Sequence, residues 1–133
     1  MSKSVSRGIA AVVLAGLWIN TNEFLRNEIW LKSDWLAHYQ SLGRSFPGGP
    51  VQGAVWVLWG FVFAAALFAL SQRWSLWGST LLGWILAFVL MWLVIWNLGV
   101  LPQSILPMAV PLSLIETLGA VWICQRVASR IGG

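Results

Sequence analysis

The sequence predicts an all-α membrane protein, a bundle of four transmembrane helices with an amphipathic interfacial helix between the first and the second. Composition is the first reason, because 59% of the residues are hydrophobic and only 9% are charged, whereas soluble domains carry about 25% charged residues. Segment length is the second reason, since a spanning helix needs ~20 mostly apolar residues. Four such helices and their connections use nearly the whole chain, so we expect a single integral membrane domain, 1–133.

The first helix is the least apolar of the four. Its apolar core is short and ends at Asn20, so a spanning helix must run from about 7 to 26 and carry Glu23 into the outer half of the membrane. Lys3 and Arg7 precede this core as they would in a signal peptide, but no A-x-A-like cleavage site follows it. We therefore expect an uncleaved anchor.

The connector after the first helix mixes aromatic and charged residues. Leu31, Trp35, Tyr39 and Leu42 recur within it at helical spacing. This mixture is typical of a helix that lies in the headgroup layer. We expect such a helix over 28–43.

Three longer apolar segments complete the bundle. The second helix is predicted over 51–71, the third over 76–101 and the fourth over 108–125. Only short connections join these three segments, at 72–75 and 101–107.

Basic residues predict the orientation. Five Lys and Arg residues lie on the side of the two termini and three lie on the other side, which by the positive-inside rule places both termini in the cytoplasm. The five are Lys3, Arg7, Arg73, Arg126 and Arg130, and the three are Arg26, Lys32 and Arg44. We expect a multi-pass protein of the cell membrane, as in a bacterial inner membrane.

Glu116 is the strongest functional candidate. On insertion scales a charge at the centre of a bilayer costs about 2.5–3.5 kcal/mol, so such a residue usually faces the interior of a bundle and has a function. The helical period of 100° per residue places Glu116 in one small and polar stripe with Ala109, Ser113 and Ala120.

The same periodicity sorts the residues of the other helices. Small and polar residues share one side of the third helix: Thr80, Gly83, Ala87 and Asn97. Its tryptophans take the other side, which we expect to face lipid: Trp77, Trp84, Trp92 and Trp96. In the first helix Asn20, Glu23 and Asn27 share a narrow arc with Trp18 opposite. Asn97 is thus predicted to point inward.

These directions converge on an outward-opening polar pocket with Glu116 at its floor. The candidate ligand-binding residues are Glu116, Asn97, Asn20, Glu23 and Ser113. Each has a structural alternative. Asn20 and Asn97 would form hydrogen bonds that hold helices together. Glu23 would be a solvated carboxylate or a partner of Arg26. Glu116 would be protonated and hydrogen-bonded to one of the two asparagines.

Three functions fit these residues. The first is binding or transport of a small or lipophilic ligand in the pocket. The second is a non-catalytic subunit or assembly factor of a larger membrane complex, which the small-residue helix faces and short loops favour. The third is a membrane enzyme acting on a lipid or isoprenoid, with Glu116 and Glu23 as acid and base. No nucleophile–base arrangement appears, so no catalytic residue is assigned.

The remaining expectations concern cofactors and partners. Neither metal-ligand spacing of Cys and His nor a phosphate-binding glycine loop is present, so no metal and no cofactor is predicted. The net charge of +4 does not indicate nucleic acid, because the basic residues are scattered between apolar runs. The expected partners are the lipid bilayer, a small-molecule ligand, and either further copies of the chain or a larger membrane complex.

Overall fold

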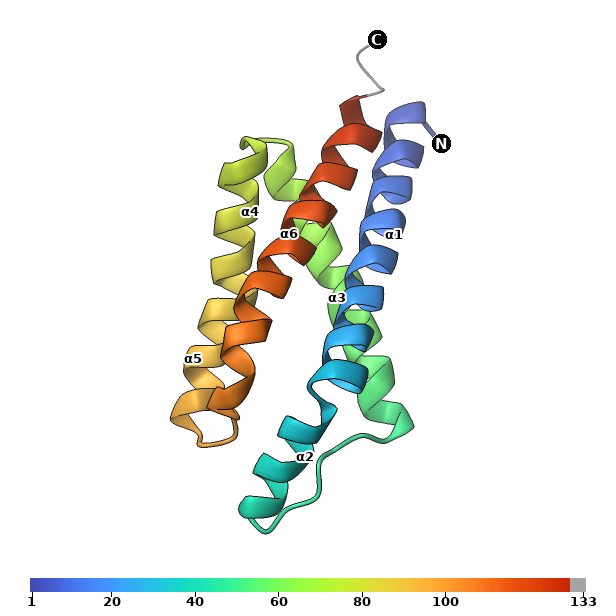
Figure 1. Cartoon of the computed structure of the whole chain (residues 1–133). Coiled ribbons are helices and arrows are strands. Elements are labelled where there is room, and N and C mark those ends of the chain that lie inside the picture. The colour runs from blue at the N-terminus through green and yellow to red at the C-terminus, as the bar shows by residue number, and fades with distance from the viewer. Residues whose placement is uncertain (130–133) are drawn as a thin grey trace.

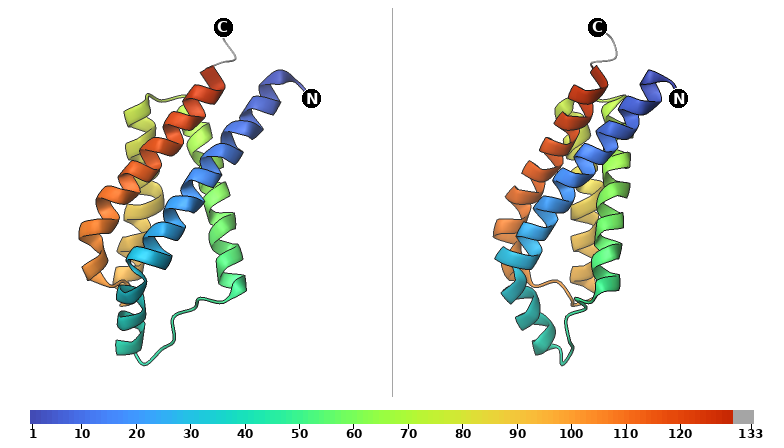
Figure 2. Two further views of the ribbon diagram at one scale, coloured as in Figure 1. Left: turned by 45° about the vertical axis from the view of Figure 1, so that its right-hand side comes forward. Right: turned by 90° about the vertical axis from the view of Figure 1, so that its right-hand side faces the viewer.

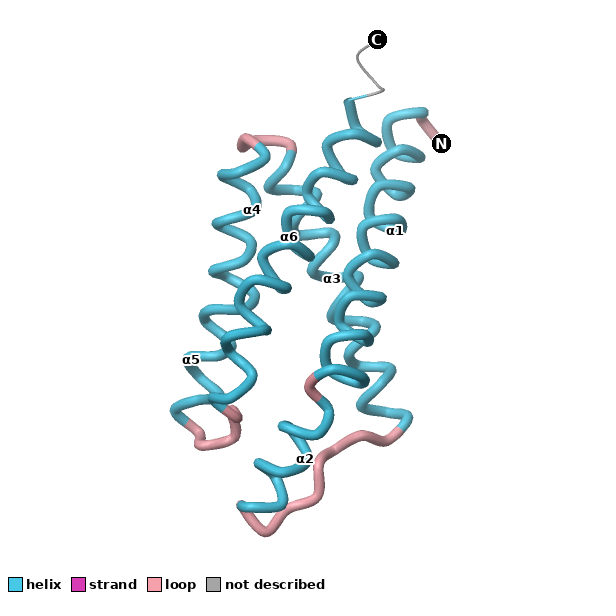
Figure 3. Tube along the Cα trace, viewed as in Figure 1, coloured by secondary structure: helices cyan, strands magenta, loops and turns pink. Residues whose placement is uncertain are grey.

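A computed structural model describes residues 1–129 of the protein, and within this range the chain forms helices and no strands (Figures 1 and 3). Four helical segments are long and apolar enough to cross a membrane: Lys3–Trp30, Pro50–Ser71, Leu76–Asn97 and Gln103–Ala128. The predicted all-helical class with four long apolar helices is therefore confirmed.

The first half of the chain holds two of these segments and the short helix between them. Helix α1 (Lys3–Phe24) continues into a π-helical segment, η1 (Leu25–Trp30), and α2 (Lys32–Ser41) follows directly. A loop then leads to α3 (Pro50–Ser71). The long pink loop before α3 is visible in Figure 3.

The second half holds the other two segments. The third span is one rod made of α4 (Leu76–Trp84), a π-helical segment η2 (Ile85–Val89) and α5 (Leu90–Asn97). The fourth begins with a 3-10 turn, η3 (Gln103–Ile105), and continues as α6 (Leu106–Ser129).

Local sequence signals set the helix ends. The side chains of Ser2 and Ser75 cap the N-termini of α1 and α4 by accepting backbone N–H bonds, and Pro50 occupies the first turn of α3. Gly43 and Gly99 follow α2 and α5 with φ angles of 69° and 75°, the left-handed conformation that commonly ends a helix. Gly99 thus ends the third span a few residues before its predicted end.

The four long helices run alternately up and down. Helix α1 packs against α3 and α6, while α4 packs against α6 and α3. Figure 2 shows α1 and α6 side by side and inclined to α3 and α4. The start of α1 and the end of α6 lie at the same end as the α3–α4 turn (Figure 1). Of the five basic residues assigned to this end, Arg130 lies outside the described residues.

Small residues on α1 and α6 allow the helices to approach closely. A Cβ on Gly119 of α6 would lie 2.6 Å from Nε1 of Trp18 on α1, and one on Gly16 would collide with the ring of Phe61 on α3. The predicted stripe of α6 is buried throughout, as the exposure of Ala109, Ser113, Glu116 and Ala120 is at most 2%. This burial confirms the inward direction of Glu116.

Asn97 corrects the prediction for the third helix, because its side chain is exposed at the end of α5. Thr80 and Gly83, which precede η2, are buried as predicted. A π-helical turn holds an extra residue, so the side chains that follow η2 are rotated by ~100° from the positions that a regular α-helix would give. Trp84 also departs from the lipid-facing side, since its indole N–H donates to Oγ of Ser113 (2.8 Å).

Helix α2 forms within the predicted range but begins later, at Lys32. Figures 1 and 2 show it extending past the ends of α3 and α6, away from the four long helices. It is held to the connection between α5 and α6 by two hydrogen bonds, from His38 Nε2 to the carbonyl of Gly99 (2.9 Å) and from Ser104 Oγ to Asp34 Oδ1 (2.9 Å). Its position in the headgroup layer stays a prediction.

Candidate functional site

Two buried carboxylates share one arginine between α1 and α6. Nη1 of Arg26 lies 3.2 Å from Oε1 of Glu116, and Nη2 of the same guanidinium binds Oε1 of Glu23. Glu116 is 0% exposed, Arg26 4% and Glu23 8%. We call these three residues the buried charge cluster. It joins the end of the first span to the middle of the fourth.

Hydrogen bonds extend the buried charge cluster toward α2. Asn27 Nδ2 donates to Oε2 of Glu23 (3.0 Å), and Nε1 of Trp35 on α2 donates to Oδ1 of Asn27 (3.2 Å). Both oxygens of Glu23 therefore accept a hydrogen bond. A continuous chain of polar groups runs from Trp35 to Glu116.

Aromatic rings cover the other side of Arg26. Its guanidinium carbon lies 5.4 Å from the centre of the Phe88 ring, within the range of a cation–π interaction. Phe88 belongs to η2 and contacts the rings of Trp59, Phe63 and Trp92. Both π-helical segments thus border the buried charge cluster, η1 through Arg26 and η2 through Phe88; such segments occur frequently at functional sites.

One oxygen of Glu116 differs from all other carboxylate oxygens of the cluster. Oε2 is fully buried and has no hydrogen-bond partner among the residues described. The backbone carbonyl of Glu116, in contrast, accepts the indole N–H of Trp18 (2.8 Å), which ties α6 to α1 at this position. A buried polar atom without a partner is costly, so Oε2 marks the atom where a proton or a ligand would bind.

Five residues were predicted to bind a ligand. Two of them, Glu116 and Glu23, lie together because both contact Arg26. Ser113 lies one turn from Glu116 and is engaged by Trp84. Asn20 is half-buried between α1 and α3, where it donates to the carbonyls of Gly16 and Val57. The bond to Gly16 stays within α1, whereas the bond to Val57 joins α1 to α3, as the structural alternative for Asn20 predicts.

Arg26 is the residue that sequence reasoning missed as a partner of Glu116. A signal for it existed, because Arg26 follows Glu23 by three residues and thus shares its helix face. The pairing of Glu23 with Arg26 was one of the two structural alternatives for Glu23, and it is confirmed. The contact of Arg26 with Glu116 joins residues 90 positions apart, which no local spacing reveals.

The surroundings of the cluster are closed. Two surface grooves within residues 1–129 lie between α1 and α6 near the termini, and neither is lined by Glu116. Within the same range, no three His, Cys, Asp or Glu side chains lie close enough together to hold a metal ion.

Comparisons with protein-family models, with curated proteins and with solved structures found no match for this chain.

Proposed function

We propose that this chain is a multi-pass membrane protein with both termini in the cytoplasm, and that it binds or transports a small lipophilic cation at the buried charge cluster in exchange for a proton. One observation carries the proposal: Oε2 of Glu116 is buried without a hydrogen-bond partner among the described residues.

The charges of the cluster support this reading. Two ionised carboxylates and one guanidinium leave a net charge of −1, and an unbalanced charge in an apolar interior costs several kcal/mol. A proton on Glu116 removes this charge, and so does a cationic group of a ligand. The two occupants therefore exclude each other, which is the basis of exchange.

The surroundings favour a lipophilic cation. Arg26 already holds a cationic group between Glu116 and the Phe88 ring, so the protein has built a position suited to positive charge next to aromatic faces. A ligand cation would bind Oε2 of Glu116, the oxygen that Arg26 does not contact. Because the cluster is closed, the ligand enters only when α1 and α6 separate.

The test uses tetraphenylphosphonium as the probe cation. Protein reconstituted in liposomes that contain a pH-sensitive dye should release protons when the probe is added, and the probe should bind the purified protein in titration calorimetry. Glu116→Gln should abolish both signals while the helix content stays unchanged, because the amide keeps the size of the side chain. Glu28→Gln is the matched control, since it removes a carboxylate that is exposed and paired with Lys32.

Full probe binding and proton release in Glu116→Gln would contradict the proposal. The cluster would then be structural, and the subunit or assembly factor of a larger membrane complex would become the leading function. Loss of both signals in Glu28→Gln as well would point to surface charge rather than to the buried site.

A further inference from the structure

A groove runs between α1 and α6 at the end of the molecule that carries the termini. It consists of two hollows of about 480 Å³ each, a volume typical of ligand sites. Leu14, Arg126 and Val127 line both hollows, so the two are continuous. Arg7 lines the outer one, and Thr21 marks the far end of the inner one.

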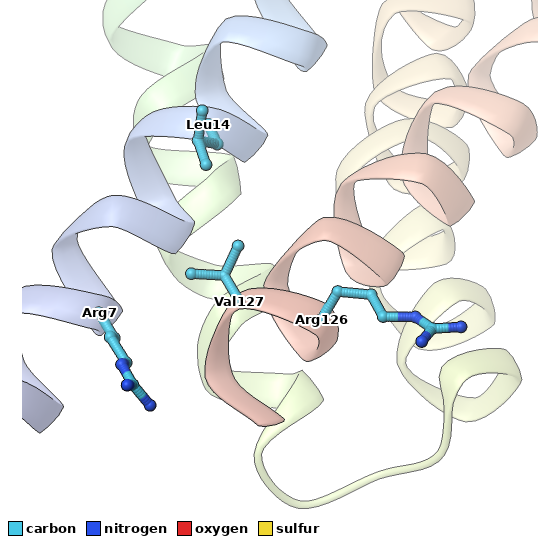
Figure 4. Close-up of a pocket in the computed structure, with 4 residues that line it drawn as sticks. All are labelled: Arg7, Leu14, Arg126 and Val127. Carbon is cyan, nitrogen blue, oxygen red and sulfur yellow. The ribbon is translucent and has the colours of Figure 1, made fainter. Parts of the chain in front are cut away.

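The walls of the groove are apolar. Leu14 and Leu17 on α1 and Trp122 on α6 each expose about half of their surface, although they belong to helices that pack against each other. Figure 4 shows Leu14 and Val127 between the two helices, with Arg7 on the α1 side of Val127 and the Arg126 side chain directed to the opposite side of α6, away from Arg7. The groove is therefore apolar along its length, and its end near Arg7 and Arg126, which we call the basic mouth, is basic.

The charged side chains that the structure describes at this end of the molecule are all basic. Lys3 and Arg73 lie at the same end as Arg7 and Arg126, whereas the chain has only four Asp and Glu residues, none of which lies there. The acidic residues are Glu23, Glu28, Asp34 and Glu116. Arg126 is held beside the groove by Trp122, with its guanidinium carbon 5.5 Å from the centre of the indole ring.

The groove is long enough to cross one leaflet of a bilayer. Arg7 and Thr21 are fourteen residues apart on one helix, and a rise of 1.5 Å per residue gives ~21 Å between them. Half of a hydrocarbon core of about 30 Å is ~15 Å. An acyl chain that starts at the basic mouth would thus remain in the groove over its whole length.

We propose that this groove binds one phospholipid with an anionic headgroup. The phosphate binds Arg7 at the mouth of the groove and is met by Arg126 after the Arg126 side chain turns toward α1, and one acyl chain follows Leu14 and Leu17 toward Thr21. Each guanidinium has five N–H donors, so it binds a phosphate oxygen in addition to the contacts that it already makes. The site rests on the membrane placement proposed above and is independent of Glu116.

Binding of phosphatidylglycerol tests this site. Native mass spectrometry of the protein in mild detergent, titrated with phosphatidylglycerol or with phosphatidylcholine of the same acyl chains, should show one phosphatidylglycerol bound about 30-fold more tightly, as expected for two arginines at an anionic lipid. The double variant Arg7→Gln with Arg126→Gln should lose this preference. Arg7→Lys with Arg126→Lys, which keeps both charges, should retain a preference and shows that the variants fold.

Control variants separate this site from its alternatives. Arg73→Gln removes a basic residue from the same end but outside the groove, and should leave the preference unchanged. Val127→Trp should fill the groove and weaken both lipids, whereas Glu116→Gln should alter neither. Inorganic phosphate alone should not displace the bound phosphatidylglycerol.

Three results would overturn the proposal. Equal affinity for the two lipids in the unchanged protein would show that the groove does not recognise an anionic headgroup. A loss of preference in Arg73→Gln as large as in the double Gln variant would assign the preference to surface charge. A dimer that persists in the spectra and dissociates in Val127→Trp would show that a second copy of the chain occupies the groove. Failure of the Glu116 exchange test leaves these readouts intact, so the two proposals stand or fall separately.

Discussion

Arg26 determines the state of both buried carboxylates. It binds Glu23 and Glu116 from one guanidinium and is itself almost fully buried. Lys32 and Glu28 form a contact of 2.6 Å, which is shorter than the contact of Arg26 with Glu116, but their side chains are 33% and 42% exposed. The difference in surroundings, rather than in distance, decides how much each pair contributes, because water screens the exposed pair.

Arg26→Gln should lower the free energy of unfolding by about 3–5 kcal/mol, since it leaves two buried carboxylates without a positive charge. Lys32→Gln should cost at most about 1 kcal/mol, the value of an exposed ion pair. Unfolding in mixed micelles with increasing SDS, followed by circular dichroism, measures both.

A double variant adds an internal control for Arg26. Glu116→Gln in the Arg26→Gln background should restore part of the lost stability, because it removes one of the two uncompensated charges. If Arg26→Gln were no more destabilising than Lys32→Gln, the cluster would not be held together by charge.

At the level of the elements, the π-helical segment η2 explains why helical periodicity predicts the buried side of α6 correctly but not that of the third span. Helix α6 is regular at Glu116, and its stripe is buried as predicted. The third span is interrupted by η2, after which Asn97 turns outward. An extra residue in one turn shifts every later side chain around the helix, so a wheel drawn through such a segment is wrong beyond it.

Helix α2 depends on its contacts with the α5–α6 connection. Asp34→Ala combined with His38→Ala removes the hydrogen bonds to Ser104 and Gly99, each of which contributes about 1 kcal/mol. Amide hydrogen exchange of Lys32–Ser41, measured by mass spectrometry, should accelerate about fivefold per lost bond.

The matched control for α2 is Gln40→Ala, a substitution at an exposed position. It should leave exchange in α2 unchanged, and exchange in α1 should not respond to either variant. Identical exchange rates in the double variant and in Gln40→Ala would mean that α2 is held by other contacts.

At the scale of the whole molecule, the four long apolar helices within residues 1–129 place the start of α1, the end of α6 and the α3–α4 turn at one end (Figure 1). The basic residues Lys3, Arg7, Arg73 and Arg126 gather at this end. This asymmetry predicts the orientation of the bundle, because Lys and Arg near the ends of spanning helices are retained on the cytoplasmic side.

Reporter fusions test the orientation. Fusions after Gln72 and after Gly133 should both report a cytoplasmic location, and a fusion after Arg44 should report an external one. An external signal from the C-terminal fusion would reverse the bundle and place the basic mouth of the α1–α6 groove on the outside. Exchanging Arg73 for Gln serves as a control, since one charge of five should not invert the topology.

The sequence by itself determined the all-helical class of the protein, the number of its long apolar helices and the inward direction of Glu116. These properties follow from hydropathy and from a regular period, both of which are read within one segment. The tertiary structure alone decided which cation meets Glu116, that Asn97 is exposed, and that α2 extends past the bundle. Those outcomes depend on contacts between distant segments and on two π-helical turns, because a charge is compensated by whatever lies near it in space.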